Sequence, residues 1–324
     1  MIYQYTIKSF EEIYLIGWLL NRWIFRGHAE SIWHLESKAE RASAALELLG
    51  PADLERLAVE RFMREAQQYA HHVPDRESAT DWLAFLQHYG GPTRLLDFTE
   101  SIYVALFFAI ENSPQEAAAV WAINEPKIFK NLDARIDNDT SLGGRDYSPS
   151  HKLINERIGR GVYEPGLLPV MPLWMSDRQS IQQGVFLYPE DLRQLPKGDG
   201  NPEGKRHVTF EDNLMAEFNL TAEALAAPTI IDSIEKMNDR NRNLQWSIIK
   251  IIIPWERELR VHLMGELQKM NVTHRTLFPG LEGLARSYSF PLEGYEASRI
   301  WAKAFTPQIF RDASTNDASE PNSN

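Results

Sequence analysis

The sequence predicts a mixed α+β fold in which helices cover a central sheet. Short apolar segments typical of strands alternate with segments whose apolar residues recur at helical spacing. One helical segment, 102–110, is apolar on nearly every side, so it belongs inside a core. The composition agrees, because 43% of the 324 residues are hydrophobic, which is ordinary for a globular core.

The first predicted elements are a strand and a long helix. Residues 22–27 are typical of a short strand that ends in a turn. A helix is expected to begin at Pro51, since proline is favoured at the first helical position. The apolar residues that would form its buried stripe recur at four-residue spacing, at Leu54, Ala58, Phe62 and Ala66.

A second helix is predicted over residues 82–88. Thr80 or Asp81 can cap its start, because both side chains can accept a hydrogen bond from the first turn. The Gly-Gly-Pro turn at 90–92 must end it, since glycine is favoured just after a helix and proline cannot continue one.

The remaining elements alternate between strands and helices. Residues 93–97 are typical of a strand, and Thr99 is the expected cap of the apolar helix at 102–110. Further strands are predicted at 118–124, 180–187 and 247–253, followed by a helix marked by Leu259, Leu263 and Leu267.

The chain is predicted to form one elaborated domain over residues 1–306. Two polar segments, near 131–150 and 197–207, have the composition of insertions and not that of clear linkers. Residues 307–324 are rich in Asp, Asn, Ser, Thr and Pro, so we expect a disordered tail there.

Charge and cysteine content exclude several classes of protein. The net charge of −11 argues against bulk coating of nucleic acid, which needs Lys and Arg to displace counterions. Without cysteine, the chain can form neither disulfides nor cysteine-based metal sites. His71, His72 and Asp75 are a weak metal set, because adjacent helical residues point to different faces. No metal is expected.

No membrane attachment is expected either. The most apolar run near the start, 13–20, is shorter than the roughly 20 residues that a bilayer requires. It follows Glu11 and Glu12, and it lacks the basic leader and the cleavage site of a signal peptide. We therefore expect a soluble, cytoplasmic protein.

Two segments carry more polar chemistry than a scaffold needs, although phosphate-loop, GxGxxG, HExxH and GxSxG motifs are absent. In the first, Arg26 ends a hydrophobic strand before Gly27, an arrangement suited to clamping an anion or a ribose. The second, 87–100, places His, Tyr, Arg, Asp, Thr and Glu between two buried helices. The alternative is structural, with Arg26 paired to a carboxylate and Arg94 paired to Asp97.

Both segments resemble the FRG domain family. Trp-Ile-Phe-Arg-Gly at 23–27, followed by Trp33, Leu35 and Arg41, is similar to the motif that names the family. Within 88–109, His-Tyr-Gly-Gly-Pro-Thr-Arg-Leu-Leu-Asp-Phe-Thr and then Val-Ala-Leu-Phe-Phe-Ala are similar to its most distinctive stretch. Two later segments fit the same order, namely Arg178 with 182–186, and 276–284.

The layout more distantly resembles the ADP-ribosyltransferases. Those proteins have an aromatic-Arg-Gly or aromatic-His-Gly strand, a strand ending in Ser or Thr before a VAxxFA helix, and a strand bearing Gln and Glu. Here 25–27, 97–99, 104–109 and 182–184 follow that order. The resemblance implies a split sheet and NAD as the substrate. It also implies transfer of ADP-ribose to a macromolecular acceptor or protein partner, in a bacterial toxin or phage-defence setting.

The resemblance also implies roles for individual residues. Arg26 would hold a phosphate or the nicotinamide ribose, and Gly27 would offer backbone contacts to the carboxamide. Tyr89 or Phe98 would stack on the nicotinamide ring. The other candidates are Thr99 and Gln183 on ribose hydroxyls, His88 or Asp97 as the base, and Arg94 and Gln182 in NAD binding.

One departure from the transferase pattern bears on the chemistry. Gln182 and Gln183 stand where a Glu is usual, and a carboxamide cannot act as a base. Glu190 lies further downstream. The alternative is a non-catalytic module that binds a nucleotide, a nucleic-acid end or a protein in the same cleft. A metal-dependent nuclease would need clustered carboxylates, and the marked region offers only Asp97 and Glu100.

Overall fold

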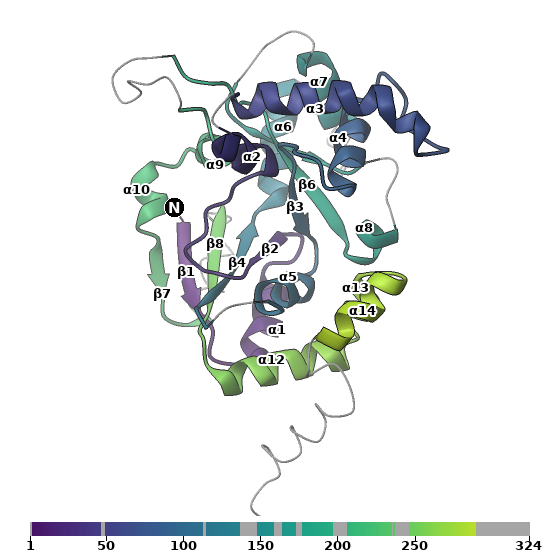
Figure 1. Ribbon diagram of the computed structural model, residues 1–324. Helices are drawn as coiled ribbons and strands as arrows, with labels where there is room; N and C mark the ends of the chain where they lie inside the picture. The colour runs from purple at the N-terminus through teal and green to yellow at the C-terminus, as the bar shows by residue number, and fades with distance from the viewer. Residues whose placement is uncertain are drawn as a thin grey trace, which may run out of the picture. The chain divides into compact units, whose positions relative to one another are not determined.

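The chain divides into two compact units, Met1–Pro254 and Trp255–Asn324. They divide the span that the sequence predicted as one domain. The predicted tail, 307–324, lies outside the described residues. The computed structural model describes residues 2–46, 49–112, 115–136, 148–158, 164–172, 177–196, 206–234, 236 and 246–289 (Figure 1).

The first unit is built on a mixed sheet of eight strands in the described residues, which confirms the predicted α+β class. Neighbouring strands from β5 to β8 run antiparallel, whereas β1 is parallel to both β8 and β7. The predicted strands at 22–27, 118–124 and 247–253 correspond to β2, β4 and β8. Across the sheet the order is β5 (Leu167–Val170), β6 (Gly184–Pro189), β3 (Leu96–Thr99), β2 (Ile24–His28), β4 (Ala118–Ile123), β8 (Ile248–Ile253), β1 (Ile2–Thr6) and β7 (Thr229–Ile231).

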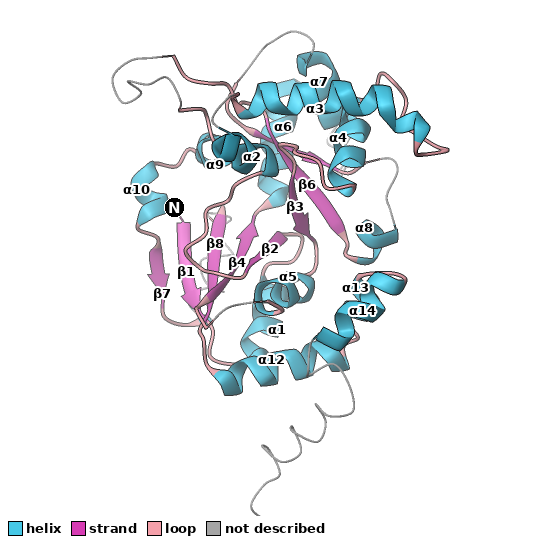
Figure 2. Cartoon of the chain, in the orientation of Figure 1, coloured by secondary structure: helices cyan, strands magenta, loops and turns pink. Residues whose placement is uncertain are grey.

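The sheet opens between β2 and β3. These two strands pair in register at a single position, Phe25 with Thr99. By contrast, all five residues of β2 pair with β4, and all four residues of β3 pair with β6. Figure 2 shows β3 and β6 on one side of this junction and β2, β4, β8, β1 and β7 on the other. The ADP-ribosyltransferase form of a split sheet stays a prediction.

Helices cover the sheet, as the sequence predicts. The most apolar of them, α5, has seven of its nine residues buried. The helices of the first unit are α1 (Phe10–Leu19), α2 (Lys38–Leu46), α3 (Pro51–Glu65) with the 3-10 turn η1 (Ala66–Gln68), α4 (Ala79–His88), α5 (Ile102–Ile110), α6 (Glu125–Ile136), α7 (Ser148–Ile158), α8 (Asp177–Ile181), α9 (Phe210–Phe218) and α10 (Ala222–Ala226).

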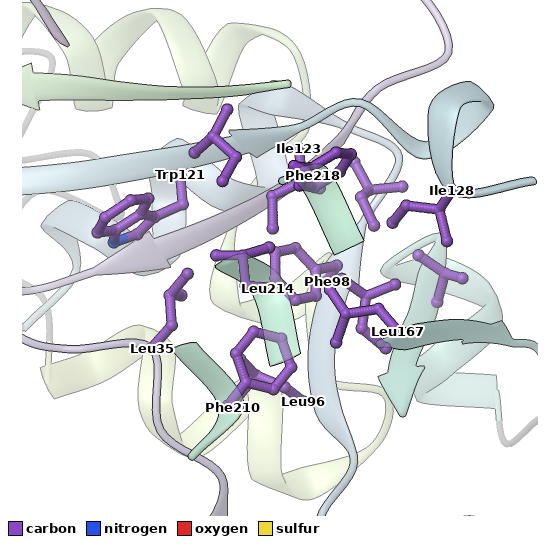
Figure 3. Packing of buried hydrophobic residues seen from close by; sticks show 14 of the residues in the cluster. Leu35, Leu96, Phe98, Trp121, Ile123, Ile128, Leu167, Phe210, Leu214 and Phe218 are labelled. Atoms are coloured by element: carbon purple, nitrogen blue, oxygen red, sulfur yellow. The ribbon is translucent and has the colours of Figure 1, made fainter. Parts of the chain in front are cut away.

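One core cluster packs α9 against the middle of the sheet (Figure 3). Phe210 and Leu214 of α9 meet Leu96 and Phe98 of β3 and Trp121 of β4, and all five side chains are buried. Burial of such large side chains stabilises a fold by about 1.5–3 kcal/mol each. The cluster therefore joins strands from both sides of the β2–β3 junction.

The backbone of α5 lies directly against Gly27 of β2. A Cβ atom at Gly27 would stand 2.1 Å from the carbonyl oxygen of Ala105 and 2.6 Å from the amide nitrogen of Ala109. No side chain fits in that space. The glycine after Arg26 is thus required by helix–strand packing, and the approach of a ligand to its backbone stays a prediction.

The start of α4 differs from the prediction. The helix begins at Ala79 with Ser78 at the N-cap position, so Thr80 and Asp81 lie in the first turn. The hydroxyl of Ser78 donates to the Asp81 carboxylate at 2.7 Å, which links the N-cap to that turn. The predicted stop is confirmed, since Gly90 adopts a φ of +86° in the region that favours glycine.

The cap of α5 is Ser101 and not Thr99. The Ser101 hydroxyl accepts a hydrogen bond from the Val104 amide. Thr99 belongs to β3, which begins and ends later than the predicted strand at 93–97. Thr99 instead donates its hydroxyl to the backbone carbonyl of Gln182 at 2.6 Å.

The predicted strand at 180–187 is two elements. Residues up to Ile181 belong to α8, and β6 begins at Gly184. Gln183, between them, has a φ of +50°, a left-handed turn that no strand continues through.

The polar segment near 131–150 is helical at both ends. Residues up to Ile136 complete α6, and α7 begins at Ser148. Residues 137–147 lie outside the described residues. The second polar segment is closed by a bridge between Gln194 and His207, and its residues 197–205 also lie outside the described residues.

The second unit contains α12 (Arg257–Lys269), α13 (His274–Leu277) and α14 (Leu281–Ser289). Its first helix carries the predicted stripe of Leu259, Leu263 and Leu267, all three of which are buried. In neither unit do the described residues include a helix with the length and apolar character needed to cross a bilayer.

Replacing Gly27 by alanine should destabilise the first unit. We expect Gly27→Ala to lower the free energy of unfolding by at least about 2 kcal/mol, because the new methyl group must displace the α5 backbone. Urea unfolding followed by circular dichroism measures this. Gly50→Ala is the control, since a Cβ there meets only ordinary contacts at 3.6 Å, and a change there as large as at Gly27 would contradict the packing argument.

Candidate functional site

A cavity of about 430 Å³ lies at the opening between β2 and β3. Side chains and backbone from α2, α4, α5 and α8 complete its walls. It is lined by Phe25, Arg26, Gly27, Lys38, Arg41, Ala84, Gln87, His88, Leu95, Leu96, Asp97, Phe98, Thr99, Ala105, Phe108, Arg178, Gln179, Gln182, Gly184 and Phe186.

The cavity gathers positive charge in an acidic protein. Arg26, Lys38, Arg41 and Arg178 line it, and Asp97 is the one carboxylate among the described residues of its wall. The chain as a whole carries a net charge of −11. A concave site with this local excess of cations is suited to an anionic ligand.

Arg26 spans the junction between the two strands. Its Nη1 donates to the backbone carbonyl of Asp97 at 2.7 Å and lies 3.9 Å from the Asp97 carboxylate. Burial lowers the pKa of the Arg26 guanidinium, the Asp97 carboxylate raises it in part, and Arg41 lowers it further. The sequence allowed, as an alternative, that Arg26 pairs with a carboxylate. Asp97 is that carboxylate, and the pair faces the cavity.

Lys38 and Arg41 extend into the same cavity from α2. The Lys38 ammonium donates to the backbone carbonyl of Gly90, and the Arg41 Nη1 donates to that of Glu36 at 2.6 Å. Carbonyl contacts hold these groups in place without neutralising their charge. Sequence reasoning missed Lys38 as a site residue, and it noted Arg41 and Arg178 only as parts of the family resemblance.

Asp97 accepts a hydrogen bond at Oδ1 from Nε2 of Gln87, at 2.8 Å. The Oε1 atom of Gln87 accepts in turn from the hydroxyl of the buried Thr93. The Asp97 side chain keeps 63% of its surface exposed, so a ligand in the cavity can reach it. Gln87 was not among the predicted site residues.

The structure brings together most, but not all, of the predicted site residues. Arg26, Gly27, His88, Asp97, Phe98, Thr99 and Gln182 line the cavity. Gln183 does not, and its backbone carbonyl accepts from the Glu100 amide at 3.0 Å. Tyr89 is exposed outside the cavity wall, and Glu190 is buried away from it.

Two predicted contacts disagree with the observed burial. The ring of Phe98 packs in the core cluster and is 3% exposed, so it has no open face for stacking on a ligand. Arg94 is also buried, and its Nε donates to the Glu55 carboxylate at 2.5 Å. Arg94 therefore pairs with Glu55 instead of Asp97, and this pair explains why Glu55 is buried within α3. The predicted apolar stripe is half-buried at Leu54, Ala58 and Phe62 and fully buried only at Ala66.

His28 supports Arg26 from within the sheet. The Arg26 Nε donates to the His28 Nε2 at 3.2 Å, which requires that nitrogen to be unprotonated. Burial and then the Arg26 charge lower the pKa of His28 to about 3, opposed in part by the Trp33 backbone. His28 is neutral at physiological pH for these reasons.

The described residues contain no group of three or more His, Asp or Glu side chains placed to hold a metal ion. The arrangement in the cavity instead combines cations with hydrogen-bonding amides. It can bind phosphate groups, and its single carboxylate can accept a proton.

Residues 21–118 match the FRG domain family, which confirms that resemblance. The matched segment contains Arg26, Lys38, Arg41, Gln87 and Asp97, and thus most of the polar wall of the cavity. No curated protein and no solved structure matches the chain significantly. The resemblance to ADP-ribosyltransferases stays a prediction.

Breaking the Arg94–Glu55 pair should destabilise the fold strongly. We expect Arg94→Met to lower the free energy of unfolding by about 3 kcal/mol, because it leaves the Glu55 carboxylate buried without its cation. The double variant Glu55→Leu/Arg94→Met removes both charges and should lose less than the sum of the single changes. Urea unfolding measures all three, and an Arg94→Met loss below about 1 kcal/mol would contradict the structural role.

His28 should make the protein less stable in mild acid. Below its ordinary pKa of 6.5 the unfolded chain binds a proton at His28, whereas the folded chain does not until about pH 3. The part of the free energy of unfolding that depends on neutral His28 is therefore fully present above pH 6.5. It falls as the pH is lowered, by about 2 kcal/mol at pH 5.

The variant His28→Gln keeps an acceptor for Arg26 but does not titrate. Its loss of stability between pH 7 and pH 5 should be smaller than that of the wild type by about 2 kcal/mol. His34→Gln, at an exposed histidine, is the matched control. An equal response of the two variants would show that His28 is not the group responsible.

Proposed function

We propose that this FRG domain protein binds NAD in the cavity and transfers ADP-ribose to a macromolecular acceptor. One observation carries the proposal: four cationic side chains and one accessible carboxylate converge where the sheet opens. The order of the motifs along the chain, which resembles that of ADP-ribosyltransferases, supports the same reading.

The cations divide into two sets with different tasks. Lys38 and Arg41 stand three positions apart on α2, so they project on the same side of the helix, and both are held only by backbone carbonyls in the described contacts. They are suited to the diphosphate, together with Arg178. Arg26 stands beside Asp97 and is suited to the ribose next to the reacting bond.

The reaction breaks the bond between the ribose C1′ and the nicotinamide nitrogen, and the electron pair leaves with nicotinamide. The ribose becomes oxocarbenium-like, and a nucleophile of the acceptor forms the new bond to C1′. The proton of that nucleophile passes to Asp97, the carboxylate in the cavity wall. Asp97 thereby takes the role of the Glu that other transferases have at the position of Gln182 or Gln183. The same negative charge favours the developing cation.

A non-catalytic nucleotide-binding module is the second candidate. Its support is that Gln182 lines the cavity as a carboxamide, while Gln183 lies outside the wall. Such a module would bind NAD through the same cations and release no nicotinamide.

The binding half of the proposal is tested with inorganic pyrophosphate in isothermal titration calorimetry. Lys38→Met and Arg41→Met should each weaken pyrophosphate binding by about tenfold, the effect of losing one charge-assisted hydrogen bond. Arg61→Met, at an exposed arginine of α3, should bind like the wild type. If all three variants bind alike, the cavity is not the anion site.

The chemical half is tested by release of nicotinamide from NAD in the presence of cell lysate as a source of acceptor. Asp97→Asn should reduce the rate by at least about 100-fold, because the amide cannot take the proton, while pyrophosphate binding persists. Pyrophosphate binding without any nicotinamide release by the wild type would favour the non-catalytic module. Strict dependence on added Mg²⁺ or Mn²⁺ would instead favour a nuclease.

A further inference from the structure

Gln87 links a buried hydroxyl to the carboxylate of the cavity. Its Oε1 accepts from the hydroxyl of Thr93, which is fully buried, and its Nε2 donates to the Asp97 Oδ1 at 2.8 Å. Gln87 itself is half-buried at the end of α4. The three side chains thus form one continuous set of hydrogen bonds that runs from the interior to the cavity.

The direction of these hydrogen bonds is fixed by chemistry. If the Gln87 amide were rotated by half a turn, its oxygen would face the Asp97 oxygen, and two acceptors would repel each other. With the observed orientation the amide hydrogen faces Asp97, and the Thr93 hydroxyl satisfies the amide oxygen on the other side. Asp97, which only accepts, selects this orientation, and the Thr93 hydroxyl, which can donate or accept, then holds the amide in it.

The consequence is that the two Asp97 oxygens differ. Oδ1 is held by Gln87, whereas Oδ2 stands 3.9 Å from the Arg26 Nη1, beyond a direct hydrogen bond. Oδ2 is therefore the oxygen that remains available to a ligand, on a side chain that is 63% exposed. A carboxylate restrained at one oxygen loses less freedom when the other oxygen takes part in a reaction.

Arg26 does not depend on this restraint. Its Nη1 donates to the backbone carbonyl of Asp97 and its Nε donates to His28, so its position is set by the two strands. A change at Gln87 or Thr93 should therefore disturb the carboxylate and leave the cations in place.

We propose that Gln87, held by the hydroxyl of Thr93, is the positioning residue that holds Asp97 for proton transfer in the cavity. The role in proton transfer rests on the proposed function. The restraint of Asp97 by Gln87 does not, because it can be measured without the reaction. A role in positioning predicts a change in turnover without a change in anion binding.

The test compares Thr93→Val with the wild type in the full-length, ¹⁵N-labelled chain. The Gln87 side-chain amide signal is assigned by its absence in Gln87→Met. In Thr93→Val its hydrogen exchange should accelerate by about fivefold, since the amide is then free to rotate away from Asp97. Nicotinamide release should fall by about tenfold, with the Kd for pyrophosphate unchanged within about twofold.

Thr80→Val is the matched control, because Thr80 is equally buried, belongs to α4 and does not line the cavity. It should leave amide exchange at Gln87 and nicotinamide release at wild-type values. Unchanged amide exchange in Thr93→Val overturns the inference, and so does a matching loss of pyrophosphate binding. If the wild type releases no nicotinamide, the transfer proposal fails, and the amide exchange still decides whether Gln87 restrains Asp97.

Discussion

The approach of α5 to Gly27 is the contact on which the arrangement of the site depends. The helix follows β3 after only Glu100 and Ser101, and its backbone then lies against β2 so closely that no side chain fits between them. One helix is thereby joined to both strands of the junction, although those strands pair in register at a single position. Because few hydrogen bonds join β2 to β3, the packing of α5 against Gly27 determines how far apart the two strands stand.

This constraint has an electrostatic consequence. Side chains alternate along β2, so Arg26 and His28 project to the face opposite Gly27, and Arg26 reaches the Asp97 carbonyl across the opening. Burial there disfavours charge, as the lowered pKa values of Arg26 and His28 show. The neutral His28 accepts from Arg26 instead of repelling it, which lets one cation lie inside the sheet next to a carboxylate.

The fold and part of the site could be predicted because their signals are local. An apolar helix at 102–110 has to be buried wherever it lies in the fold, and β-branched runs such as 247–253 favour strands. Boundaries were less accurate where a distant partner decided them. Thr99 resembled a helix cap, yet its hydroxyl donates to Gln182, a residue 83 positions away in the chain.

Residue patterns alone predicted the fold class, the FRG resemblance and the grouping of Arg26 with the segment around Asp97. Contacts between distant segments determine which of two polar residues, Arg94 or Asp97, faces the cavity. Arg94 pairs with Glu55, 39 positions away, while Asp97 meets Arg26, 71 positions away. Lys38 and Arg178 are a further example, because only the fold brings these two distant residues to the wall of one cavity. Charge acts through distance in space, and sequence spacing does not fix the distance between residues on different elements.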